Sequence, residues 1–352
     1  MLRTALILLL AAGVAASGAC TRAGRWTEPV AVARGPAAEL RLGYFPNVTH
    51  AAALIGVRQG FFAGSLGPGT ELTTQTFNAG PEAVGALLGG SLDVAFIGSG
   101  PTINTFARSN GEAIRLVAGA TSAGAQLVAR PGITDVGQLR GKRVATPQLG
   151  NTQDIALKKL LAEQLLPVGT GPDQVTIVNA DNPQTLQAFR DGQIDAAWLP
   201  EPWSSRLVVE AGAGVLLDER DLWPGGRFPT TVVVVRTAYL AGHPQTVQAF
   251  LHGLLAATDW TAADPARARS AVNDALASLT GKPLSPPVIE RAFGNITVTT
   301  DPLAATFPQL AKDSVTAGIA SGEPNLAGLV DLGPLNAVLT GAGRPTVAGL
   351  DR

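Results

Sequence analysis

Two stretches of the chain carry the same short pattern: Gly89-Gly90-Ser91-Leu92-Asp93-Val94-Ala95-Phe96 and Asp191-Gly192-Gln193-Ile194-Asp195-Ala196-Ala197-Trp198. In each stretch a helical segment ends in a turn of small or charged residues, and a short apolar strand follows an aspartate. The spacing is too irregular for a solenoid, which needs a fixed short period. The repetition therefore predicts two related α/β lobes.

Strands and helices alternate on both sides of these two stretches. Around the first, we expect strands at 40–45, 71–77, 92–97 and 114–119 and helices at 49–62, 81–88 and 102–109. Around the second, we expect strands at 126–129, 143–146, 174–178, 195–198 and 230–236, helices at 151–165 and 183–190, and then helices at 244–260, 265–279, 286–293 and 303–321. The alternation predicts an α/β fold with mostly parallel sheets that helices cover on both faces.

The length also favours two lobes, because single hydrophobic cores stop growing at about 250–300 residues and this chain has 352. We assign residues 39–122 and 235–352 to lobe 1 and residues 123–234 to lobe 2. Two crossings then join the lobes, near 118–129 and near 230–236. Open α/β sheets bind ligands at the carboxyl ends of their strands, so the sequence predicts a ligand site in the cleft between the lobes.

Composition excludes several classes of protein. The chain has 26 Lys and Arg against 27 Asp and Glu, whereas nucleic-acid binders show a basic excess or a clustered basic stripe. No internal segment reaches the roughly 18–20 apolar residues that span a bilayer. With a single cysteine the chain forms no internal disulfide, so its stability has to come from packing.

The N-terminus has the pattern of an export signal. Arg3 precedes an apolar run from Ala5 to Ala16, and Ser17-Gly18-Ala19 supplies small residues for cleavage. Cys20 follows directly, where a bacterial lipoprotein signal places the cysteine that receives a lipid. We therefore expect a signal peptide at 1–19, lipidation at Cys20 and a flexible tether at 20–38. Ordinary secretion with cleavage after Ala19 is the alternative.

Three strand-to-helix turns rich in small polar residues are candidate anion sites. They are Gln148-Leu149-Gly150-Asn151-Thr152-Gln153-Asp154, Pro46-Asn47-Val48-Thr49-His50 and Gly98-Ser99-Gly100-Pro101-Thr102. Free backbone N–H groups at a helix N-terminus attract anions, and none of the three turns contains Lys or Arg. A plain capped helix is the alternative for the first turn.

The turn Leu199-Pro200-Glu201-Pro202-Trp203 is stiffened by two prolines and presents Glu201 and Trp203 as further candidates. Glu201 would repel a bare anion, so it would face either a ligand amine or an internal partner. A stiff turn with Trp203 packed in the core is equally compatible with the sequence. The turn Asp221-Leu222-Trp223-Pro224-Gly225-Gly226 is a candidate rim of the cleft.

Catalytic and metal signatures are weak. Ser99 and Ser122 lie outside any Gly-x-Ser-x-Gly elbow, and His50, His243 and His252 are far apart in the sequence. No ligand spacing typical of zinc and no phosphate-binding loop is present. We therefore expect no enzymatic activity, no metal and no cofactor, and His50 fits a cap or a hydrogen-bonding group in a pocket.

Several segments together resemble the substrate-binding proteins of ABC importers, in the branch that binds nitrate, taurine, aliphatic sulfonates and thiamine precursors. They are LRLGYF (40–45), FNAGPEAVGALLGGSLDVAFIGSGP (77–101), DVGQLRGKRVATPQLGNTQD (135–154), DAAWLPEPW (195–203), TTVVVVR (230–236) and HPQTV (243–247). The resemblance covers about 40–339. It implies the two-lobed type II periplasmic-binding-protein fold, with a two-strand hinge and lobes that close over one small molecule.

The same resemblance implies residue roles. Oxyanion oxygens would meet Gly150-Asn151-Thr152-Gln153 and Gly98-Ser99-Gly100, and Asn47, Asn78 and Thr231 would line the other walls. Together with Thr49, Glu201 and Trp203 these form the predicted ligand-binding set. In sulfonate and taurine binders the 199–203 turn usually begins with an aromatic residue, so Leu199 leaves the ligand's tail contacts open.

The resemblance further implies a lipid-anchored, monomeric receptor on the extracytoplasmic face that delivers a small oxyanion to a permease and its ATPase. An exported enzyme or sensor domain on the same fold, or a binder of a thiamine-pyrimidine precursor, is the alternative. The cysteine-rich motif of the thiamine-precursor synthases is absent, because Cys20 is the only cysteine.

Overall fold

The computed structural model describes residues 33–350. The predicted signal peptide, Cys20 and most of the predicted tether lie outside the described residues. The described end of that tether packs on the folded body: the Arg34 N–H donates to the Gly242 carbonyl at 2.7 Å, and Ala37 is buried.

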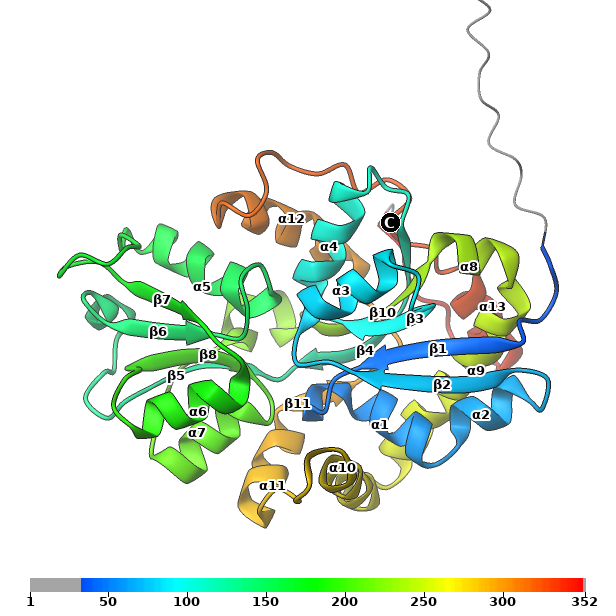
Figure 1. The fold of residues 1–352 in the computed structure, drawn as a ribbon, viewed down its shortest axis with the longest axis horizontal. Coiled ribbons are helices and arrows are strands. Elements are labelled where there is room, and N and C mark those ends of the chain that lie inside the picture. The colour runs from blue at the N-terminus through cyan, green and yellow to red at the C-terminus, as the bar shows by residue number, and fades with distance from the viewer. Residues whose placement is uncertain (1–32, 351–352) are drawn as a thin grey trace, which may run out of the picture. The chain divides into compact units, whose positions relative to one another are not determined.

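A six-stranded sheet forms the large lobe (Figure 1), with strand order β11-β4-β10-β3-β1-β2. Its strands are β1 (Glu39–Tyr44), β2 (Glu71–Thr76), β3 (Val94–Ile97), β4 (Ile114–Ala123), β10 (Pro229–Arg236) and β11 (Ile296–Val298). The helices of this lobe are α1 (Ala51–Arg58), α2 (Phe61–Leu66), α3 (Gly80–Leu88), α4 (Ser99–Arg108), α8 (Thr237–Gly242), α9 (Pro244–Ala263), α10 (Pro265–Thr280), α11 (Pro286–Gly294), α12 (Phe307–Thr316) and α13 (Gly333–Gly341).

A five-stranded sheet of order β7-β6-β8-β5-β9 forms the small lobe. Its strands are β5 (Ala125–Ala129), β6 (Arg143–Thr146), β7 (Thr176–Asn179), β8 (Ala196–Pro200) and β9 (Gly214–Asp218). Its helices are α5 (Thr152–Glu163), α6 (Asn182–Arg190) and α7 (Trp203–Ala211), and the single-turn 3-10 helices of the molecule are η1 (Val48–His50), η2 (Val136–Leu139), η3 (Glu219–Leu222), η4 (Pro224–Gly226) and η5 (Ala304–Thr306).

Most strands in each sheet share one direction, but both sheets are mixed. β1 pairs in parallel with β2 and β3, whereas β10 is antiparallel to β3 and β4, and β11 is antiparallel to β4. In the small lobe β6 is parallel to β7 and β8, while β5 is antiparallel to β8 and β9. The reversed strands β5 and β10 directly follow the two chain crossings, so the crossings interrupt the parallel order.

The repeated sequence pattern forms the same turn twice. After α3 the Gly90 N–H donates to the Leu87 carbonyl, and after α6 the Gly192 N–H donates to the Phe189 carbonyl. Both glycines have left-handed backbones, with φ of 74° and 79°, which L-residues with side chains seldom adopt. The aspartate that follows then accepts a hydrogen bond from a backbone N–H of the neighbouring parallel strand: Asp93 from the Arg41 N–H at 3.1 Å and Asp195 from the Arg143 N–H at 2.8 Å.

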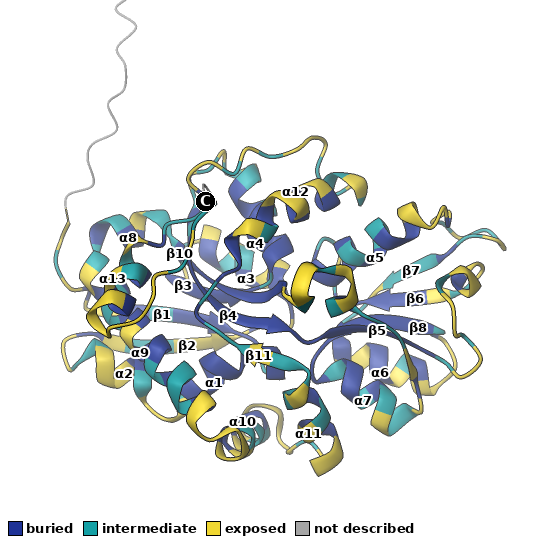
Figure 2. Ribbon diagram, turned by 180° about the vertical axis from the view of Figure 1, so that it is seen from behind, coloured by how far each residue is buried: buried dark blue, intermediate teal, exposed yellow. Residues whose placement is uncertain are grey.

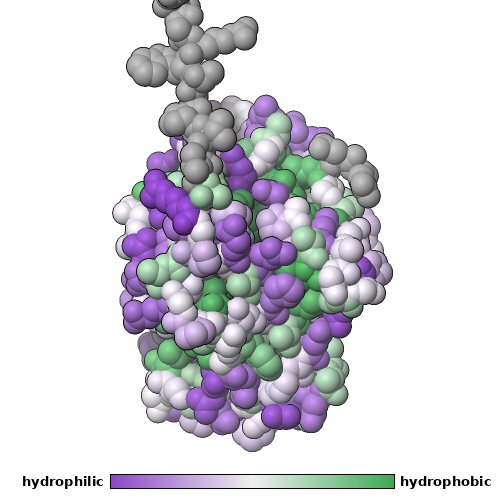
Figure 3. Space-filling model, turned by 90° about the vertical axis from the view of Figure 1, so that its right-hand side faces the viewer, coloured by the Kyte–Doolittle hydropathy of each residue, from purple (hydrophilic) through white to green (hydrophobic). Residues whose placement is uncertain are grey.

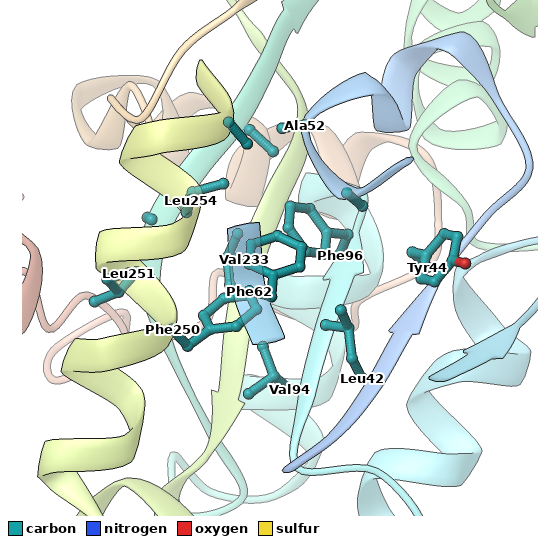
Figure 4. Close-up of a cluster of buried hydrophobic side chains, with 14 of the residues drawn as sticks. Leu42, Tyr44, Ala52, Phe62, Val94, Phe96, Val233, Phe250, Leu251 and Leu254 are labelled. Carbon is teal, nitrogen blue, oxygen red and sulfur yellow. The ribbon is translucent and has the colours of Figure 1, made fainter. Parts of the chain in front are cut away.

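Successive residues of the central strands point into cores on opposite faces of the large sheet. Phe96 and Val233 join a core with Phe62 and Phe250. Ile97 and Val232, its partner on β10, join a second core on the other face. The Phe62 and Phe250 rings stack with centroids 4.5 Å apart (Figure 4). Because helices cover both faces, the central strands are mostly apolar and appear buried along most of their length in Figure 2.

The surface around α8 and α13 contains both hydrophilic and apolar side chains. The end of the large lobe in Figure 3 carries hydrophilic side chains interspersed with smaller apolar areas. Over residues 33–350, no helix combines the length and the apolar character that a membrane crossing requires.

Several predicted elements differ from the structure. The single helix expected at 49–62 is η1, α1 and α2, because the backbone breaks at Gln59 and Gly60. The helix expected at 303–321 ends at Thr316. Helices α7, α8 and α13 and strands β9 and β11 were not predicted, since they are short or lie in segments without a clear periodicity.

The two crossings between the lobes lie side by side. β4 continues into β5 through Gly124 alone, and the return segment enters β10 at Pro229. The Ala123 N–H donates to the Phe228 carbonyl, and the Thr230 hydroxyl donates to the Ala123 carbonyl. All of β10 pairs with β3 and β4, so the chain is back in the large lobe by Pro229, earlier than the predicted boundary at 234/235.

Candidate functional site

The carboxyl ends of the parallel strands of both sheets meet at one small cavity of about 40 Å³. The large lobe contributes residues that follow β1, β2 and β3 and two residues of β10, and the small lobe contributes residues that follow β6 and β7 and the last residue of β8. The lining residues are Phe45, Asn47, Thr49, His50, Asn78, Ala79, Gly80, Gly98, Pro101, Pro147, Asn151, Thr152, Gln153, Asn182, Pro200, Thr230 and Thr231. The cleft in which the sequence predicts a ligand site therefore contains a cavity.

The N-terminus of α5 forms one wall of this cavity. Asn151 is its N-cap, and the Asn151 Oδ1 accepts a hydrogen bond from the Asp154 N–H at 2.8 Å. The N–H groups of Thr152 and Gln153, in the first turn, have no carbonyl partner within their own helix. Both residues are buried against the cavity, so the positive end of the helix dipole faces it.

An acidic side chain supports this turn from behind. The buried Asp154 carboxylate accepts from the Gly150 N–H at 2.8 Å and from the Lys158 Nζ at 2.7 Å. Its other oxygen accepts from the Asn179 Nδ2 at 2.9 Å. Asp154 thus fixes the shape of the turn, and Lys158 balances its charge.

The two lobes touch where α4 and α5 begin. The Gly100 N–H donates to the Thr152 Oγ1 at 3.2 Å, and the Asn104 Nδ2 donates to the Gly150 carbonyl at 3.4 Å. A Cβ at Gly100 would lie 3.2 Å from the Thr152 backbone nitrogen and 2.8 Å from the Ile155 Cδ1. Glycine at this position therefore permits the close approach of the two helices.

His50 is an uncharged hydrogen-bonding group in the cavity wall. Burial lowers its pKa to about 3, so the imidazole is neutral at physiological pH. The Phe45 N–H donates to the His50 Nδ1 at 3.2 Å, which places the ring hydrogen on Nε2. His50 thus acts as a pocket hydrogen-bonding group, one of the two roles that its sequence context favours.

The cavity brings together eight of the predicted site residues. These are Asn47, Thr49, Asn78, Gly98, Asn151, Thr152, Gln153 and Thr231. The other five, Ser99, Gly100, Gly150, Glu201 and Trp203, do not line it. Ser99 is fully buried, and its hydroxyl has no hydrogen-bond partner among the described residues.

Glu201 is not directed at the ligand space. It is fully buried, and its carboxylate accepts from the Asn295 Nδ2 at 2.6 Å, from the Arg291 Nη1 at 3.3 Å and from the Ser205 N–H at 3.1 Å. Arg291 also donates to the Gln126 Oε1 at 2.7 Å. Of the two roles that the sequence left open for Glu201, the structure shows bonds to internal partners, and Glu201 does not line the small cavity.

Trp203 connects the lobes instead of lining the cavity. Its indole Nε1 donates to the Asn47 Oδ1 at 2.9 Å, and the Arg206 guanidinium lies 4.8 Å from the centre of its ring. This bond occupies the Asn47 carbonyl oxygen and leaves the Asn47 amide hydrogens for other partners.

Sequence reasoning omitted some residues that line the cavity. Asn182, whose Oδ1 is buried without a partner in the described chain, follows β7 just as Asn151 follows β6. Thr230 precedes the predicted Thr231. The sequence offered one indication that Asn182 lines the cavity, namely its position after a strand, and many loop residues share that position.

Within the described chain, neither charged side chains nor a group of metal ligands lines the small cavity. With His50 neutral, no lining residue of the small cavity carries a charge at neutral pH. Within residues 33–350 no three His, Cys, Asp or Glu side chains are grouped so that they could hold a metal ion.

Comparisons with known proteins agree with this architecture. The model of the NMT1-like family matches residues 33–277. A binding protein of Brucella abortus is 27% identical over 246 residues, 65% of this chain and 74% of that protein. The taurine-binding periplasmic protein of Escherichia coli is 29% identical over 197 residues, 56% of this chain and 59% of that protein.

Among solved structures, the alkanesulfonate-binding protein SsuA of Xanthomonas axonopodis pv. citri, bound to MOPS, superposes with a TM-score of 0.67 at 23% identity. The match covers 84% of this chain and 98% of that one. The fold is therefore that of a type II periplasmic binding protein, as the sequence predicted.

Proposed function

Because the chain belongs to the NMT1-like family, we propose that it is the substrate-binding component of an ABC importer on the extracytoplasmic side of the membrane. It binds a small oxyanion, an aliphatic sulfonate, taurine or nitrate, in the small cavity between the lobes. It acts as a monomer that delivers this ligand to a permease and its ATPase and does not convert it chemically. Relatives named for taurine and alkanesulfonate binding support this ligand class.

The observation that carries the proposal is the set of uncharged donors around the small cavity. The first turn of α5 offers backbone N–H groups and a partial positive charge. The Thr152 hydroxyl, which accepts from Gly100, keeps its own hydrogen to donate, and the His50 Nε2 carries a hydrogen as well. Neutral donors and a helix N-terminus stabilise an oxyanion, whereas a cation would need carboxylates.

Binding acts by shifting a population of conformations. The lining comes from both lobes, so a ligand in the cavity makes contacts in the closed form that it cannot make in an open one. The permease then distinguishes closed from open receptors. Because the two crossings are hydrogen-bonded to each other, they move as one connection between the lobes.

The test is a titration of the purified protein with ethanesulfonate, taurine, nitrate and a thiamine-pyrimidine precursor, read by thermal unfolding. A ligand at 100 times its Kd stabilises the folded state by about 2.7 kcal/mol, which raises the Tm by several degrees. We expect this rise with at least one oxyanion. If the pyrimidine alone raises the Tm, or none of the four does, the oxyanion assignment fails.

For the anchor, we propose that Cys20 is lipidated and holds the protein at the membrane. Cys20 follows Ser17-Gly18-Ala19, the arrangement of a lipoprotein signal. Replacing Cys20 with Ser should move the protein from the membrane fraction to the soluble extracytoplasmic fraction. An unchanged distribution contradicts the anchor and leaves the binding role untouched.

A further inference from the structure

A second and larger cavity, of about 510 Å³, lies beside the small one and shares Thr152 with it. Its walls are α5 and η3–η4 of the small lobe and η5 and α12 of the large lobe. α5 and α12 lie side by side at this place (Figure 1). The volume is within the range of about 300–1,000 Å³ that is typical of sites for small organic molecules.

Two buried carboxyl groups, one from each lobe, line this cavity. Glu219 is 2% exposed, and its Oε2 accepts from the Trp198 Nε1 at 2.9 Å. Its Oε1 has no hydrogen-bond donor in the part of the chain that the structure describes. Asp313 is 6% exposed, and its Oδ1 accepts from the Gln309 Nε2 at 2.8 Å.

Lys159 is the one basic residue in the described lining of the cavity. It is already paired, because its Nζ lies 3.1 Å from the Glu163 Oε2. The two carboxyl groups therefore exceed the available positive charge. A buried carboxylate without a cation is costly, which makes a cationic ligand the favourable complement.

The remaining walls are apolar. Ile155, Leu222, Trp223 and Leu310 contribute side chains to the lining. Trp223 stacks on Phe228 with ring centroids 6.2 Å apart, which fixes the indole in place. Such walls fit a body of the size of an aromatic ring.

We propose that this cavity is a second binding site and that it takes an organic amine, with the ammonium group between Glu219 and Asp313 and the apolar body against Ile155, Leu222 and Trp223. The site is separate from the proposed oxyanion site and goes beyond the proposed function. Because its two carboxyl groups belong to different lobes, a bound ammonium stabilises the closed arrangement, so it tightens oxyanion binding as well.

The ionisation of these groups gives the site a pH dependence. Burial raises the pKa of Glu219 to about 8, against the opposing hydrogen bond from Trp198. Burial also raises the pKa of Asp313. The other charges that act on the pair are Asp218, Lys159 and Glu163. An ammonium ion favours the ionised carboxylates, so its affinity increases as the pH rises from 6.5 to 8.5.

Benzylamine and benzyl alcohol form the matched pair of probes, because they share the ring and differ in charge. Titration calorimetry on the purified protein at pH 8 should show binding of benzylamine and at least tenfold weaker binding of benzyl alcohol. Lowering the pH to 6.5 should weaken benzylamine binding several-fold. No binding of benzylamine at millimolar concentration, or equal binding of the two probes, overturns the proposal.

Two charge-removing variants locate the site. Glu219→Gln keeps the acceptor for Trp198, and Asp313→Asn keeps the acceptor for Gln309; each should weaken benzylamine binding at least tenfold. Asp221→Asn is the control, because Asp221 is an exposed acid on η3 that does not line the cavity. The affinity of Asp221→Asn for benzylamine should equal that of the unmodified protein. If Glu219→Gln and Asp313→Asn bind benzylamine no more weakly than Asp221→Asn does, the site is contradicted. Thermal unfolding verifies that each variant is folded.

Discussion

The two lobes repeat one turn and use its aspartate differently. Asp93 and Asp195 both accept a hydrogen bond from a backbone N–H of the neighbouring strand. Asp93 is 1% exposed and also accepts from the side chains of Arg41, at 2.7 Å, and Arg236, at 2.9 Å. Asp195 is half-buried and has no guanidinium partner among the described residues. The same sequence pattern thus supports either a turn alone or a turn and a charge network.

The helix turns differ in a similar way. α4 and α5 both begin after a strand and face the boundary between the lobes. Thr152 of α5 lines the small cavity, whereas the Ser99 hydroxyl of α4 is buried without a partner. The shared order of strand, turn and helix places both residues at the boundary between the lobes, and packing decides which side chain faces the cavity.

Removing the charge of Asp93 should have the largest effect on stability. Asp93→Asn weakens its bonds to both Arg41 and Arg236, and hydrogen bonds to charged groups each contribute about 1.5–3 kcal/mol. Since both arginines are partly exposed, we expect a loss of about 2–3 kcal/mol in the free energy of unfolding.

Asp195→Asn is the matched control, because it keeps an oxygen that can accept from the Arg143 N–H. A loss of about 1 kcal/mol or less is expected for a partly exposed bond. Urea denaturation of the two variants measures the difference. Equal losses would mean that the two arginines add nothing to the turn.

Lowering the pH should reduce the loss of unfolding free energy that Asp93→Asn causes. Burial favours the neutral carboxyl, but the hydrogen bonds from Arg41 and Arg236 outweigh it and lower the pKa of Asp93. A carboxyl with a lowered pKa in the folded state stabilises the protein above its unfolded pKa of about 3.9, and this contribution is lost as the pH falls through the folded value.

The difference in unfolding free energy between the unmodified protein and Asp93→Asn should therefore be constant from pH 7 to 5 and shrink below about pH 4. Denaturation curves at pH 7, 5, 4 and 3 test this. A difference that stays constant to pH 3 would show that the variant acts by packing and not by charge.

Sequence predicted the repeated turn, the two-lobed fold and most central elements, because each rests on local chemistry. Glycine after a helix, aspartate before a strand and continuous apolar runs all have local causes. The short β11 could not be predicted, because it forms only by pairing with β4. The break between α1 and α2 has a local signal, since Gly60 has a left-handed backbone with φ of 73°, but the continuous apolar pattern of the segment favoured a single helix. The lobe boundary was placed at residue 234 instead of 229 since the apolar run of β10 contains no sign of which sheet it joins.

The site was predictable by position and less by orientation. Asn151, Thr152 and Gln153 follow a strand and begin a helix, which places them at the cleft. For Glu201 the decisive partner, Arg291, lies 90 residues away in the sequence, and no local pattern indicates that contact. Asn182 was omitted for the same reason, since nothing in its neighbourhood distinguishes it from other residues that begin a helix.

The two helix turns should respond unequally to loss of a hydroxyl. Thr152→Val keeps the shape of the side chain and removes both the acceptor for the Gly100 N–H and the hydroxyl hydrogen that we propose as a donor to the ligand. For whichever oxyanion raises the Tm of the protein, we expect about tenfold weaker binding, as for loss of one hydrogen bond of about 1.4 kcal/mol.

Ser99→Ala is the counterpart on α4. Its hydroxyl has no partner in the described chain, so we expect binding within twofold of the unmodified protein and stability that is equal or higher. Calorimetric titration of both variants checks the pair. If Ser99→Ala weakens oxyanion binding as much as Thr152→Val does, both hydroxyls contribute equally to binding, which contradicts the predicted difference.

The smallest effect concerns the bond between Trp203 and Asn47, which joins the small lobe to the large one. Trp203→Phe retains an aromatic ring and removes the Nε1–H donor to the Asn47 Oδ1. A partly buried hydrogen bond contributes about 0.5–1 kcal/mol. Because this bond exists only where the lobes meet, its loss should weaken oxyanion binding about two- to fivefold.

Trp260→Phe is the control, because Trp260 packs on Phe61 and Arg267 within the large lobe. It should leave the affinity unchanged, as measured by calorimetry, which does not depend on tryptophan fluorescence. If both variants bind as the unmodified protein does, the Trp203–Asn47 bond makes the same contribution in the open and closed forms. Closure then depends on the ligand and on the other contacts between the lobes, which include the Gly100–Thr152 bond and the bonds of Glu201 with Arg291 and Asn295.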